Sequence, residues 1–546
     1  MTKNTIAARQ RISHMPHSEY LEHIDRHFAR REGDSEFRKA AKHYEKEIGI
    51  MRLLNLDSVM PVLTPLYCPK PKNKPRDPLC MLRALILMTL LRFSGIDDWV
   101  AQTRYESIVA ILCGFEPDDV PGVGTYYDFQ KRIIDGPYRK RRPGKVKKSE
   151  LNAKPHLRSF QSEKEAKKHE KDPNHSQSEI LVRDLLAQSD ESREDGFEKI
   201  VEDLLFQAGI IPSIEAGLLD NLEKLIVVGD GSIMKTAASA DGRPSCSCRK
   251  EGVFKCDHPR LYSSPTAQWC HNHRTNGFEF GDRYYHLIVA ANGHDFPLLS
   301  VMPGGNESDY TLSLKALDRF LKAGRENEVD IKIHAFAGDG HHDSNAHYRY
   351  LIENEIIPVI PLSANSKPVS PHLPGRDELR LDDDGTPLCP ANARMRRHQF
   401  DKKQKKHVYC CPAKRGTHKK GKAVYAFRED LCPRGSDCKP GSWPGPFVYI
   451  KSDSDPRLFP PLPRESKLYK EIANQRSAAE RINSVLDSYK IENTCRNADY
   501  GLIRILLANI AHHASVRYAE AVKKEAAAAD LKTKDPESET VSAPPT

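Results

Sequence analysis

Apolar residues recur at helical spacing through the first quarter of the chain. The stretches EYLEHIDRHFARR and FRKAAKHYEKEIGIMRLL carry them every three or four positions, and a denser helical unit runs from about Pro78 to Ile134. This pattern predicts an N-terminal all-helical domain over residues 1–134. Residues 135–195 are rich in Lys, Glu, Ser and His and have almost no apolar periodicity. We therefore expect a charged linker or insertion there, without a core of its own.

Residues 196–362 change to short apolar runs separated by turns and amphipathic stretches. KLIVVGDGSIMKT predicts a strand that ends in Gly-Asp-Gly, and DRYYHLIVAANG and DFPLLSVMPGG predict two neighbouring strands joined by a turn at Asn292–Gly293. DYTLSLKALDRFLKAG predicts an amphipathic helix closed by Gly324. DIKIHAFAGDG, SNAHYRYLIENE and IIPVIPL then predict a strand, a helix and a strand. This order indicates a mixed α/β sheet with parallel crossovers and flanking helices.

A long irregular segment separates this sheet from the last helices. Residues 363–464 are rich in Cys, Pro and Lys, and we expect them to form an inserted subdomain that contains β-strands. Helical periodicity returns over residues 465–520, in ESKLYKEIANQRSAAERINSVLDSYK and DYGLIRILLANIAHHASVRYAEAV. Residues 521–546 are expected to be a disordered tail.

The charge balance suits a polyanionic partner. The chain has 546 residues and a formal net charge of +9, from 84 Lys and Arg against 75 Asp and Glu. Basic residues cluster at Tyr138–Lys148, Arg396–Lys406 and Lys414–Lys422, where they are either nucleic-acid contacts or parts of solvated loops.

The cellular context follows from what the sequence lacks. The first residues, MTKNTIAARQRISHMPH, have no apolar signal region, and the longest apolar run is interrupted by Arg83 and is too short to span a bilayer. We expect a soluble, intracellular protein. Its 13 cysteines are then more readily explained as buried thiols or metal ligands than as a disulfide framework.

Two aspartates follow apolar runs, each inside a Gly-Asp-Gly. Asp230 and Asp339 are both expected at strand ends on one edge of the sheet, where their carboxylates can share hard cations such as Mg²⁺. Glu480 is the candidate third acid, because Arg476 and Asn483 lie on the same predicted helix face. The alternative for Glu480 is an ordinary surface salt bridge.

Asp343 follows Asp339 by four residues and directly precedes the predicted helix SNAHYRYLIENE. Its side chain is placed to accept hydrogen bonds from the free amides of the first helical turn. We therefore assign Asp343 as a helix cap and keep it as the reserve acid for the metal site.

Three blocks in this order, VVGDGS, FAGDGHHDSNAHYRYL and NQRSAAERINSVL, resemble the signature blocks of the DDE transposases of bacterial insertion sequences. The similarity runs from about Leu225 to Tyr518, and VPGVGTYYDFQKR resembles part of the N-terminal domain common in such enzymes. The resemblance implies an RNase H-like catalytic core, built from residues 196–362 and 465–520. It also implies that Asp230, Asp339 and Glu480 are catalytic and hold two Mg²⁺ ions, for which Mn²⁺ can substitute.

The helix signature of this family, Y-x2-R-x3-E-x6-K, is only partly present. Arg476 and Glu480 match it, whereas Ala473 occupies the tyrosine position and Asp487 the lysine position. Lys490 lies nearby and is a substitute for the missing lysine. Candidate DNA contacts flank the acid-bearing elements: Lys235, Arg274, Arg283, Arg476, Arg481 and Lys490.

The function implied by the resemblance is metal-dependent DNA strand cleavage at insertion-sequence ends, followed by transfer of the freed 3′-OH to target DNA. The implied partners are the terminal inverted repeats, the target DNA and a second copy of the chain assembled on DNA, in the bacterial cytoplasm at the nucleoid. Two alternatives stay open: a catalytically inactive DNA-binding regulator, and an RNase H-like structure-selective nuclease.

Two groups of cysteines are candidates for structural zinc. The first lies between the first two predicted strands, in an insertion over residues 240–275, and consists of Cys246, Cys248, Cys256, His258 and Cys270. The second lies in the 363–464 segment and consists of Cys389, Cys410, Cys411, Cys432 and Cys438. Zinc staples small loops that lack a core, although neither group has a CxxC…CxxC spacing. Reduced thiols in a compact loop are the alternative.

Overall fold

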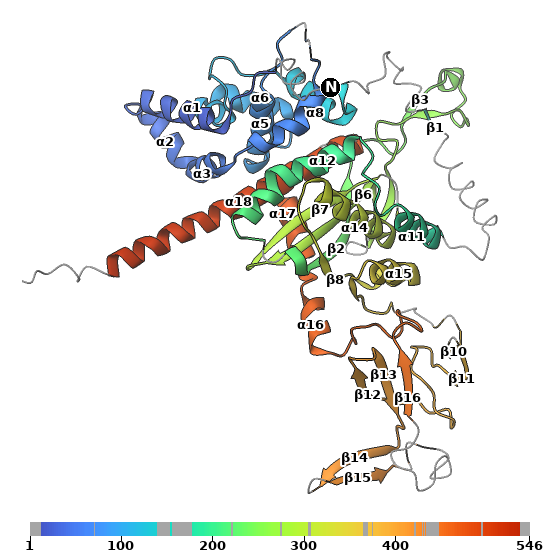
Figure 1. Ribbon diagram of the computed structural model, residues 1–546. Coiled ribbons are helices and arrows are strands. Elements are labelled where there is room, and N and C mark those ends of the chain that lie inside the picture. Colours follow the sequence, from blue (N-terminus) through green and yellow to red (C-terminus); the bar gives the residue numbers. More distant parts are fainter. Residues whose placement is uncertain are drawn as a thin grey trace, which may run out of the picture.

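The computed structural model describes residues 12–69, 71, 73–138, 153–154, 177–219, 222–272, 276–303, 307–363, 368, 370–373, 375–419, 422–428, 430, 432, 447–492 and 495–534. Helices alone make up its N-terminal part (Figure 1). They are α1 (His17–Arg30), α2 (Ser35–His43), α3 (Glu45–Leu53), α4 (Met60–Leu63), α5 (Pro78–Leu90), α6 (Ile96–Tyr105), α7 (Ser107–Cys113) and α8 (Val123–Asp135). The most apolar of the predicted segments forms α5, which is buried on all sides.

A six-stranded mixed sheet forms the centre of the molecule. Its strands are β2 (Leu225–Lys235), β5 (Gln268–Asn272), β6 (Gly277–Ala291), β7 (His294–Val301), β8 (Ile333–Ala337) and β9 (Ile357–Val359). β6 pairs antiparallel with β2, β5 and β7, whereas β2, β8 and β9 are parallel. The predicted hairpin turn is confirmed: Asn292 and Gly293 have φ of 52° and 78°, as a type I′ turn requires.

Helices cover the sheet and connect its strands. α14 (Asp309–Glu326) links β7 to β8, and α15 (Asn345–Glu353) links β8 to β9. α14 and α17 (Ser477–Ser488) both contact β2, β6 and β7. Gly231 of β2 abuts α14, whereas its neighbour Asp230 contacts α17. Because successive strand residues point to opposite faces, the two helices cover opposite faces of the sheet.

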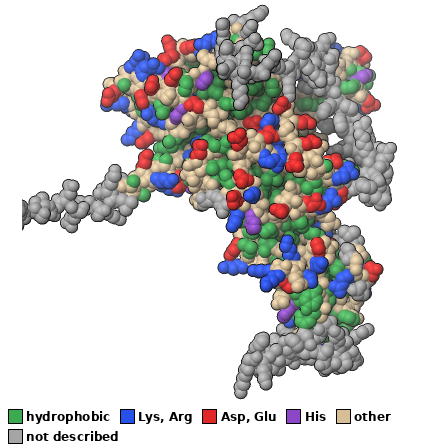
Figure 2. Space-filling view, viewed as in Figure 1, with side chains coloured by type: hydrophobic (Ala, Val, Ile, Leu, Met, Phe, Trp, Pro, Cys, Tyr) green, Lys and Arg blue, Asp and Glu red, His purple; other side chains and the backbone are tan. Residues whose placement is uncertain are grey.

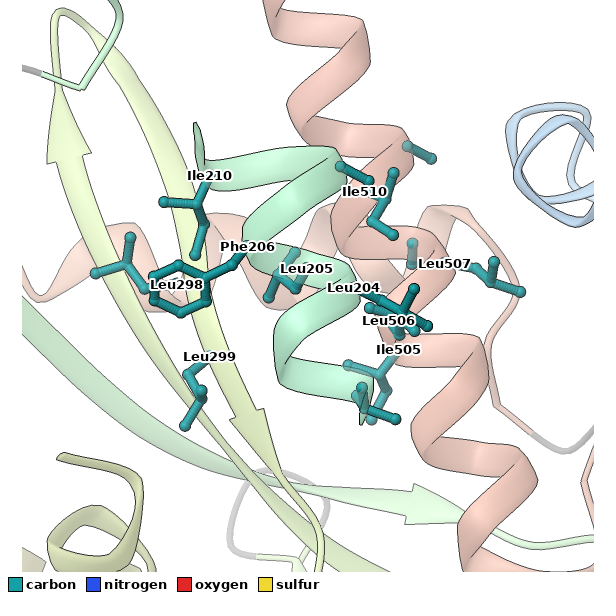
Figure 3. Close-up of a cluster of buried hydrophobic side chains, with 14 of the residues drawn as sticks. Leu204, Leu205, Phe206, Ile210, Leu298, Leu299, Ile505, Leu506, Leu507 and Ile510 are labelled. Atoms are coloured by element: carbon teal, nitrogen blue, oxygen red, sulfur yellow. The ribbon is translucent and has the colours of Figure 1, made fainter. Parts of the chain in front are cut away.

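One hydrophobic core joins the N-terminal helices to the sheet. α12 (Phe197–Leu205), a π-helical turn (Phe206–Ile210) and α13 (Ile211–Glu215) lead into it, and Figure 3 shows Phe206 beside Leu298 and Leu299 of β7. The long C-terminal helix α18 (Ala498–Lys534) packs on β7 and α12 and also on α5 and α3. The buried side chains of residues 1–134 and of the sheet therefore form one continuous cluster.

The charged region over residues 135–195 is more ordered than expected where the structure describes it. It holds β1 (Ala153–Lys154) and the helix α11 (Gln177–Ala187), which packs on α14 and α15 and buries Val182 completely. The expectation of a segment without apolar periodicity is wrong for residues 177–187. Within them SEILVRDLLA has a clear apolar stripe, which the polar composition of the surrounding residues conceals.

Three predicted helix limits also need correction. Gly324 lies inside α14, which continues to Glu326. The helix expected around Glu480 is two helices, α16 (Lys467–Asn474) and α17, which meet at Gln475 and Arg476. The tail is expected to be disordered from residue 521, but α18 continues to Lys534. The end of this helix projects beyond the body of the molecule in Figure 1. The remaining tail residues lie outside the described ones.

Short antiparallel strands make up the inserted segment of residues 363–464 (Figure 1). They are β10 (His372–Leu373), β11 (Arg376–Arg380), β12 (Arg396–Asp401), β13 (Lys406–Cys410), β14 (Lys414–Lys419), β15 (Lys422–Phe427) and β16 (Phe447–Lys451). β12, β13 and β16 form one sheet above a small core of their own. Several Lys and Arg side chains lie on the visible face of this segment, in the lower part of Figure 2.

None of the helices in the described parts of the chain combines the length and the apolarity needed to cross a membrane.

Candidate active site and metal cluster

The parallel register of β2 and β8 places Asp230 and Asp339 at the same edge of the sheet, although Asp230 does not end its strand. The parallel ladder between β2 and β8 ends at Val228 and Ala337, two residues before each aspartate. β2 itself continues to Lys235, held by antiparallel pairing with β6. Asp230 therefore lies inside a strand, at the point where its parallel neighbour stops.

The two glycines beside Asp230 allow close packing and do not make a turn. A Cβ atom on Gly229 would stand 2.0 Å from the Tyr285 hydroxyl, and a Cβ atom on Gly231 would stand 2.2 Å from Oδ1 of Asp309. Any side chain at either position would displace these groups. Close packing against Tyr285 and Asp309 therefore requires glycine at both positions.

A third carboxylate, which the sequence analysis missed, joins the site. Asp309 is the first residue of α14, and Arg283 Nη1 donates to its Oδ1 at 3.0 Å. Burial, followed by the nearby charges of Asp309 and Asp339, raises the pKa of Asp230 to about 6. In the sequence, Asp309 is recognisable only as an acid at the start of the helix after the third predicted strand. Acids are common at that position because they interact favourably with the helix N-terminus, so the position alone does not mark Asp309 as a site residue.

Two histidines fix Asp339 in its ionised form. Asp339 caps a 3₁₀ turn (Gly340–His342), and its carboxylate accepts hydrogen bonds from the His341 amide at 2.9 Å and from His342 Nδ1 at 2.7 Å. Nε2 of His342 accepts from the Tyr285 hydroxyl at 2.7 Å. Burial alone would raise the pKa of Asp339, but the hydrogen bonds from His342 and His341 outweigh it and hold the pKa far below its ordinary value.

Glu480 is exposed. The α17 side chain that reaches Asp230 is that of Asn483, whose Nδ2 is 3.5 Å from Oδ2 of Asp230. Glu480 precedes Asn483 by one turn on the same face of α17. Arg476 is the N-cap residue of α17, at the break between α16 and α17, so the continuous helix expected through Arg476 and Glu480 is interrupted there.

The six candidate DNA contacts have different surroundings. The side chains of Lys235, Arg283 and Arg481 pair with Glu279, Asp309 and Asp295, at 3.0, 3.0 and 2.5 Å. Arg476 and Lys490 are exposed. Arg274 lies outside the described residues.

Asp343 does not cap α15, so that prediction is wrong. The Ser344 hydroxyl performs this role by accepting a hydrogen bond from the His347 amide at 3.2 Å. Asp343 instead forms a bidentate ion pair with Arg457, from Nε at 2.9 Å and from Nη2 at 3.1 Å. Its side chain is fully buried.

Oxygen donors at the sheet edge suit a hard divalent cation. Burial is the main cause of the raised pKa of Asp230, and repulsion by the charges of Asp309 in α14 and of Asp339 in the turn after β8 adds to it. A bound Mg²⁺ ion would relieve this repulsion, and carboxylate oxygens are the protein ligands it prefers. The donor chemistry of these carboxylates suits the expected metal, but their oxygens are not among the described groups whose ligand atoms all lie within 4.8 Å of one another.

A separate cluster of sulfur and nitrogen donors is compatible with structural zinc. One ligand atom each of Cys246, Cys248, Cys256 and His258 lies within 4.8 Å of the others. The Sγ atoms of Cys246 and Cys256 are 3.5 Å apart, and Cys248 Sγ is 3.3 Å from His258 Nδ1. Tetrahedral ligands of zinc stand roughly 3.5 to 3.8 Å from one another. The spacing C-x-C-x7-C-x-H, two close pairs in a short loop, is the signal that identifies these four residues.

Cys270, the fifth residue predicted for this zinc site, is not part of the cluster. It lies in β5, where it is buried within the main sheet. In the second predicted group, Cys389, Cys411 and Cys432 are buried in the small cores of the inserted segment, and Cys410 ends β13. Cys438 lies outside the described residues. Among the described cysteines, those with ligand atoms spaced as a metal site requires are therefore Cys246, Cys248 and Cys256, together with His258.

His23, His27 and Glu116 form a third group with metal-like spacing, but its surroundings oppose a cation. Both histidines are buried on one face of α1, and Glu116 Oε2 is 3.1 Å from His27 Nε2. Arg26 donates to Nδ1 of His23 at 3.3 Å, and Arg31 donates to Nδ1 of His27 at 2.8 Å. A metal bound through Nε2 of His27 would need a proton on Nδ1, where Arg31 leaves no acceptor for it. Arg26 already donates to Nδ1 of His23, the nitrogen that faces Glu116.

Comparison with known proteins adds no assignment: no family model matches the chain, and no curated protein matches it.

We predict that Asp230→Asn stabilises the metal-free protein at pH 8. The pKa of Asp230 is raised from 3.8 to about 6, so its ionisation destabilises the folded state above pH 6 by at most about 3 kcal/mol. Below pH 3.8 the carboxyl is protonated in both states, so the gain should disappear near pH 4. Chemical unfolding of both proteins in a chelator at the two pH values measures this. Equal stability at pH 8 would show that the carboxylates are not in conflict.

We also predict that the purified protein holds one equivalent of zinc. Cys246→Ser or Cys256→Ser should lose it, whereas Cys270→Ser, a matched change in the same insertion, should keep it, because its thiol lies outside the cluster. Elemental analysis after dialysis against Mg²⁺ buffer is the measurement. A zinc-free wild-type protein, or zinc loss from the Cys270 variant alone, would contradict the assignment.

Proposed function

We propose that this protein is a DDE-type transposase, which cleaves DNA strands at the ends of an insertion sequence and transfers the freed 3′-OH to target DNA. The observation that carries this proposal is that Asp230, on β2, and Asp339, just after the adjacent parallel strand β8, come to the same edge of the sheet. These are the aspartates of two of the three sequence blocks that resemble the DDE family, and nothing in their sequence separation of more than a hundred residues requires them to meet.

The order of elements supports an RNase H-like assignment of the sheet. In such cores the first acid lies on the first strand, the second follows the fourth strand, and the glutamate comes on a later helix, often after an inserted segment. When β5 is treated as an addition, β2, β6, β7 and β8 are strands one to four. Asp230 lies on the first and Asp339 follows the fourth. α17 follows the strands of the inserted segment, and it contacts Asp230 through Asn483.

Each acid has a separate part in the proposed reaction. Asp230, Asp339 and Glu480 would hold divalent cations, which would neutralise the phosphodiester charge and favour attack by water or a 3′-hydroxyl and departure of the leaving oxygen. Asp339 stays ionised at all working pH values because His341 and His342 donate to it. Asp230 gives up its proton on metal binding, so metal affinity should fall as the pH drops below about 6. Glu480 completes the set by a side-chain movement along the face of α17.

DNA is the substrate, and the resemblance implies a homodimer assembled on the two ends. The exposed basic residues of the inserted segment, among them Arg396, Lys402, Lys403 and Lys405, are suited to phosphate contacts on such a substrate. They belong to one of the basic clusters predicted from the sequence.

We predict that Asp230→Asn, Asp339→Asn and Glu480→Gln each lower Mg²⁺-dependent cleavage roughly 10³-fold or more, with DNA binding retained. Glu471→Gln is the matched control, because Glu471 is an exposed glutamate on the neighbouring helix α16. The substrate is a plasmid that carries the repeats flanking the gene, and products are separated on denaturing gels.

The three candidate functions give different products in this assay. Excised and joined strands support the transposase, unjoined nicks indicate the nuclease, and binding without cleavage indicates the regulator. Cleavage at the wild-type rate by the Asp230 or Asp339 variant would refute the proposed metal site. Cleavage at the wild-type rate by the Glu480 variant would show that Glu480 is not one of its ligands.

A further inference from the structure

Arg457 reaches from the inserted segment into the turn that carries Asp339. We propose that Arg457 is a positioning residue, which holds the metal-binding carboxylate of Asp339 in place through its ion pair with Asp343. The proposal rests on the proposed function, because it assumes that Asp339 binds a divalent cation.

The ion pair is buried and saturates the Asp343 carboxylate. The side chain of Asp343 has an exposed fraction of 0% and that of Arg457 one of 10%. Oδ1 accepts from Arg457 Nε, and Oδ2 accepts from Arg457 Nη2 and from the Ser363 amide at 3.0 Å. Such a bidentate pair fixes direction as well as distance, which a lysine in the same place would not do.

Arg457 is itself held firmly in the loop after β16. Arg464 Nη2 donates to the Arg457 carbonyl at 2.7 Å and to the Tyr348 hydroxyl at 2.7 Å, and Arg464 Nε donates to the Ile360 carbonyl at 3.1 Å. The loop is thus fastened both to α15 and to the residue that follows β9. Asp343 is therefore bound to a rigid support.

Asp339 and Asp343 are the residues at the two ends of the same 3₁₀ turn (Gly340–His342). The Asp343 amide donates to the Gly340 carbonyl at 3.3 Å, and the Ser344 amide donates to the His342 carbonyl at 2.9 Å. The turn has two anchors: His342, bound to Tyr285 of the sheet, and Asp343, bound to Arg457. Without Arg457, the buried charge of Asp343 would lack its partner, and this end of the turn would rearrange to reach water.

The experiment compares metal affinity with folding in the full-length, zinc-loaded protein. Mn²⁺ binding is measured by electron paramagnetic resonance for the wild type, Arg457→Met, Arg457→Lys and a control, Arg394→Met. Arg394 lies in the same inserted segment, where it pairs with Asp382 and Asp384 on the surface. Thermal melting of each variant gives the temperature range in which it is folded.

We expect Arg457→Met to weaken Mn²⁺ binding about tenfold or more while the protein is folded, as loss of an outer-shell partner does at metal sites. Arg457→Lys should lie between this value and the wild type, and Arg394→Met should match the wild type. A folded Arg457→Met variant with wild-type Mn²⁺ affinity would overturn the proposal.

A double variant covers the case in which Arg457→Met does not fold. Asp343→Leu with Arg457→Met replaces the buried ion pair by apolar side chains, a change that often restores stability. A folded double variant with weakened Mn²⁺ binding supports the positioning role, and one with wild-type binding overturns it.

If the wild type itself binds no Mn²⁺ at Asp230 and Asp339, the proposed function fails first. If the wild type binds Mn²⁺ and cleaves DNA while both Arg457 variants behave as it does, only the positioning role fails.

Discussion

The site depends on a carboxylate that is buried close to other negative charges at one edge of a sheet. Asp230, Asp309 and Asp339 come from a strand, a helix start and a turn, and burial, followed by repulsion from the other two charges, raises the pKa of Asp230. The rest of the local structure accommodates this repulsion. Arg283 pairs with Asp309, two histidines hold Asp339 ionised, and the pKa of Asp230 is raised to about 6. Charged groups with a strongly shifted pKa are more common at functional sites than elsewhere in a fold.

The strand order and the meeting of Asp230 with Asp339 could be predicted because both depend on local pattern. Apolar runs predict the strands, the Asn292–Gly293 turn predicts the hairpin, and parallel crossovers place the two strand ends at one edge. The role of Asp343 could not be predicted in this way. Its neighbour Ser344 is an equally good helix cap, and its true partner, Arg457, is more than a hundred residues away.

Other features missed by the sequence pattern have the same physical origin. The glycines around Asp230 are needed by Tyr285 and Asp309, contacts that exist only in the folded sheet. Asp309 looks like an ordinary acid in a first helical turn, and its approach to Asp230 depends on how α14 packs. The break between α16 and α17 occurs without Pro or Gly, so periodicity alone joins the two helices. In each case tertiary packing decides what local propensity leaves open.

The central claim, that Asp230 and Asp339 hold a divalent cation together with Glu480, is tested most directly by replacing Mg²⁺ with Fe²⁺. In the presence of ascorbate and peroxide, bound iron generates hydroxyl radicals that cut the nearby backbone. The account predicts iron-dependent cuts close to residues 230, 339 and 480, all of which Mg²⁺ suppresses by competition and Asp230→Asn removes. Cuts confined to the Cys246–His258 loop, or no iron-dependent cuts in the wild-type protein, would contradict it.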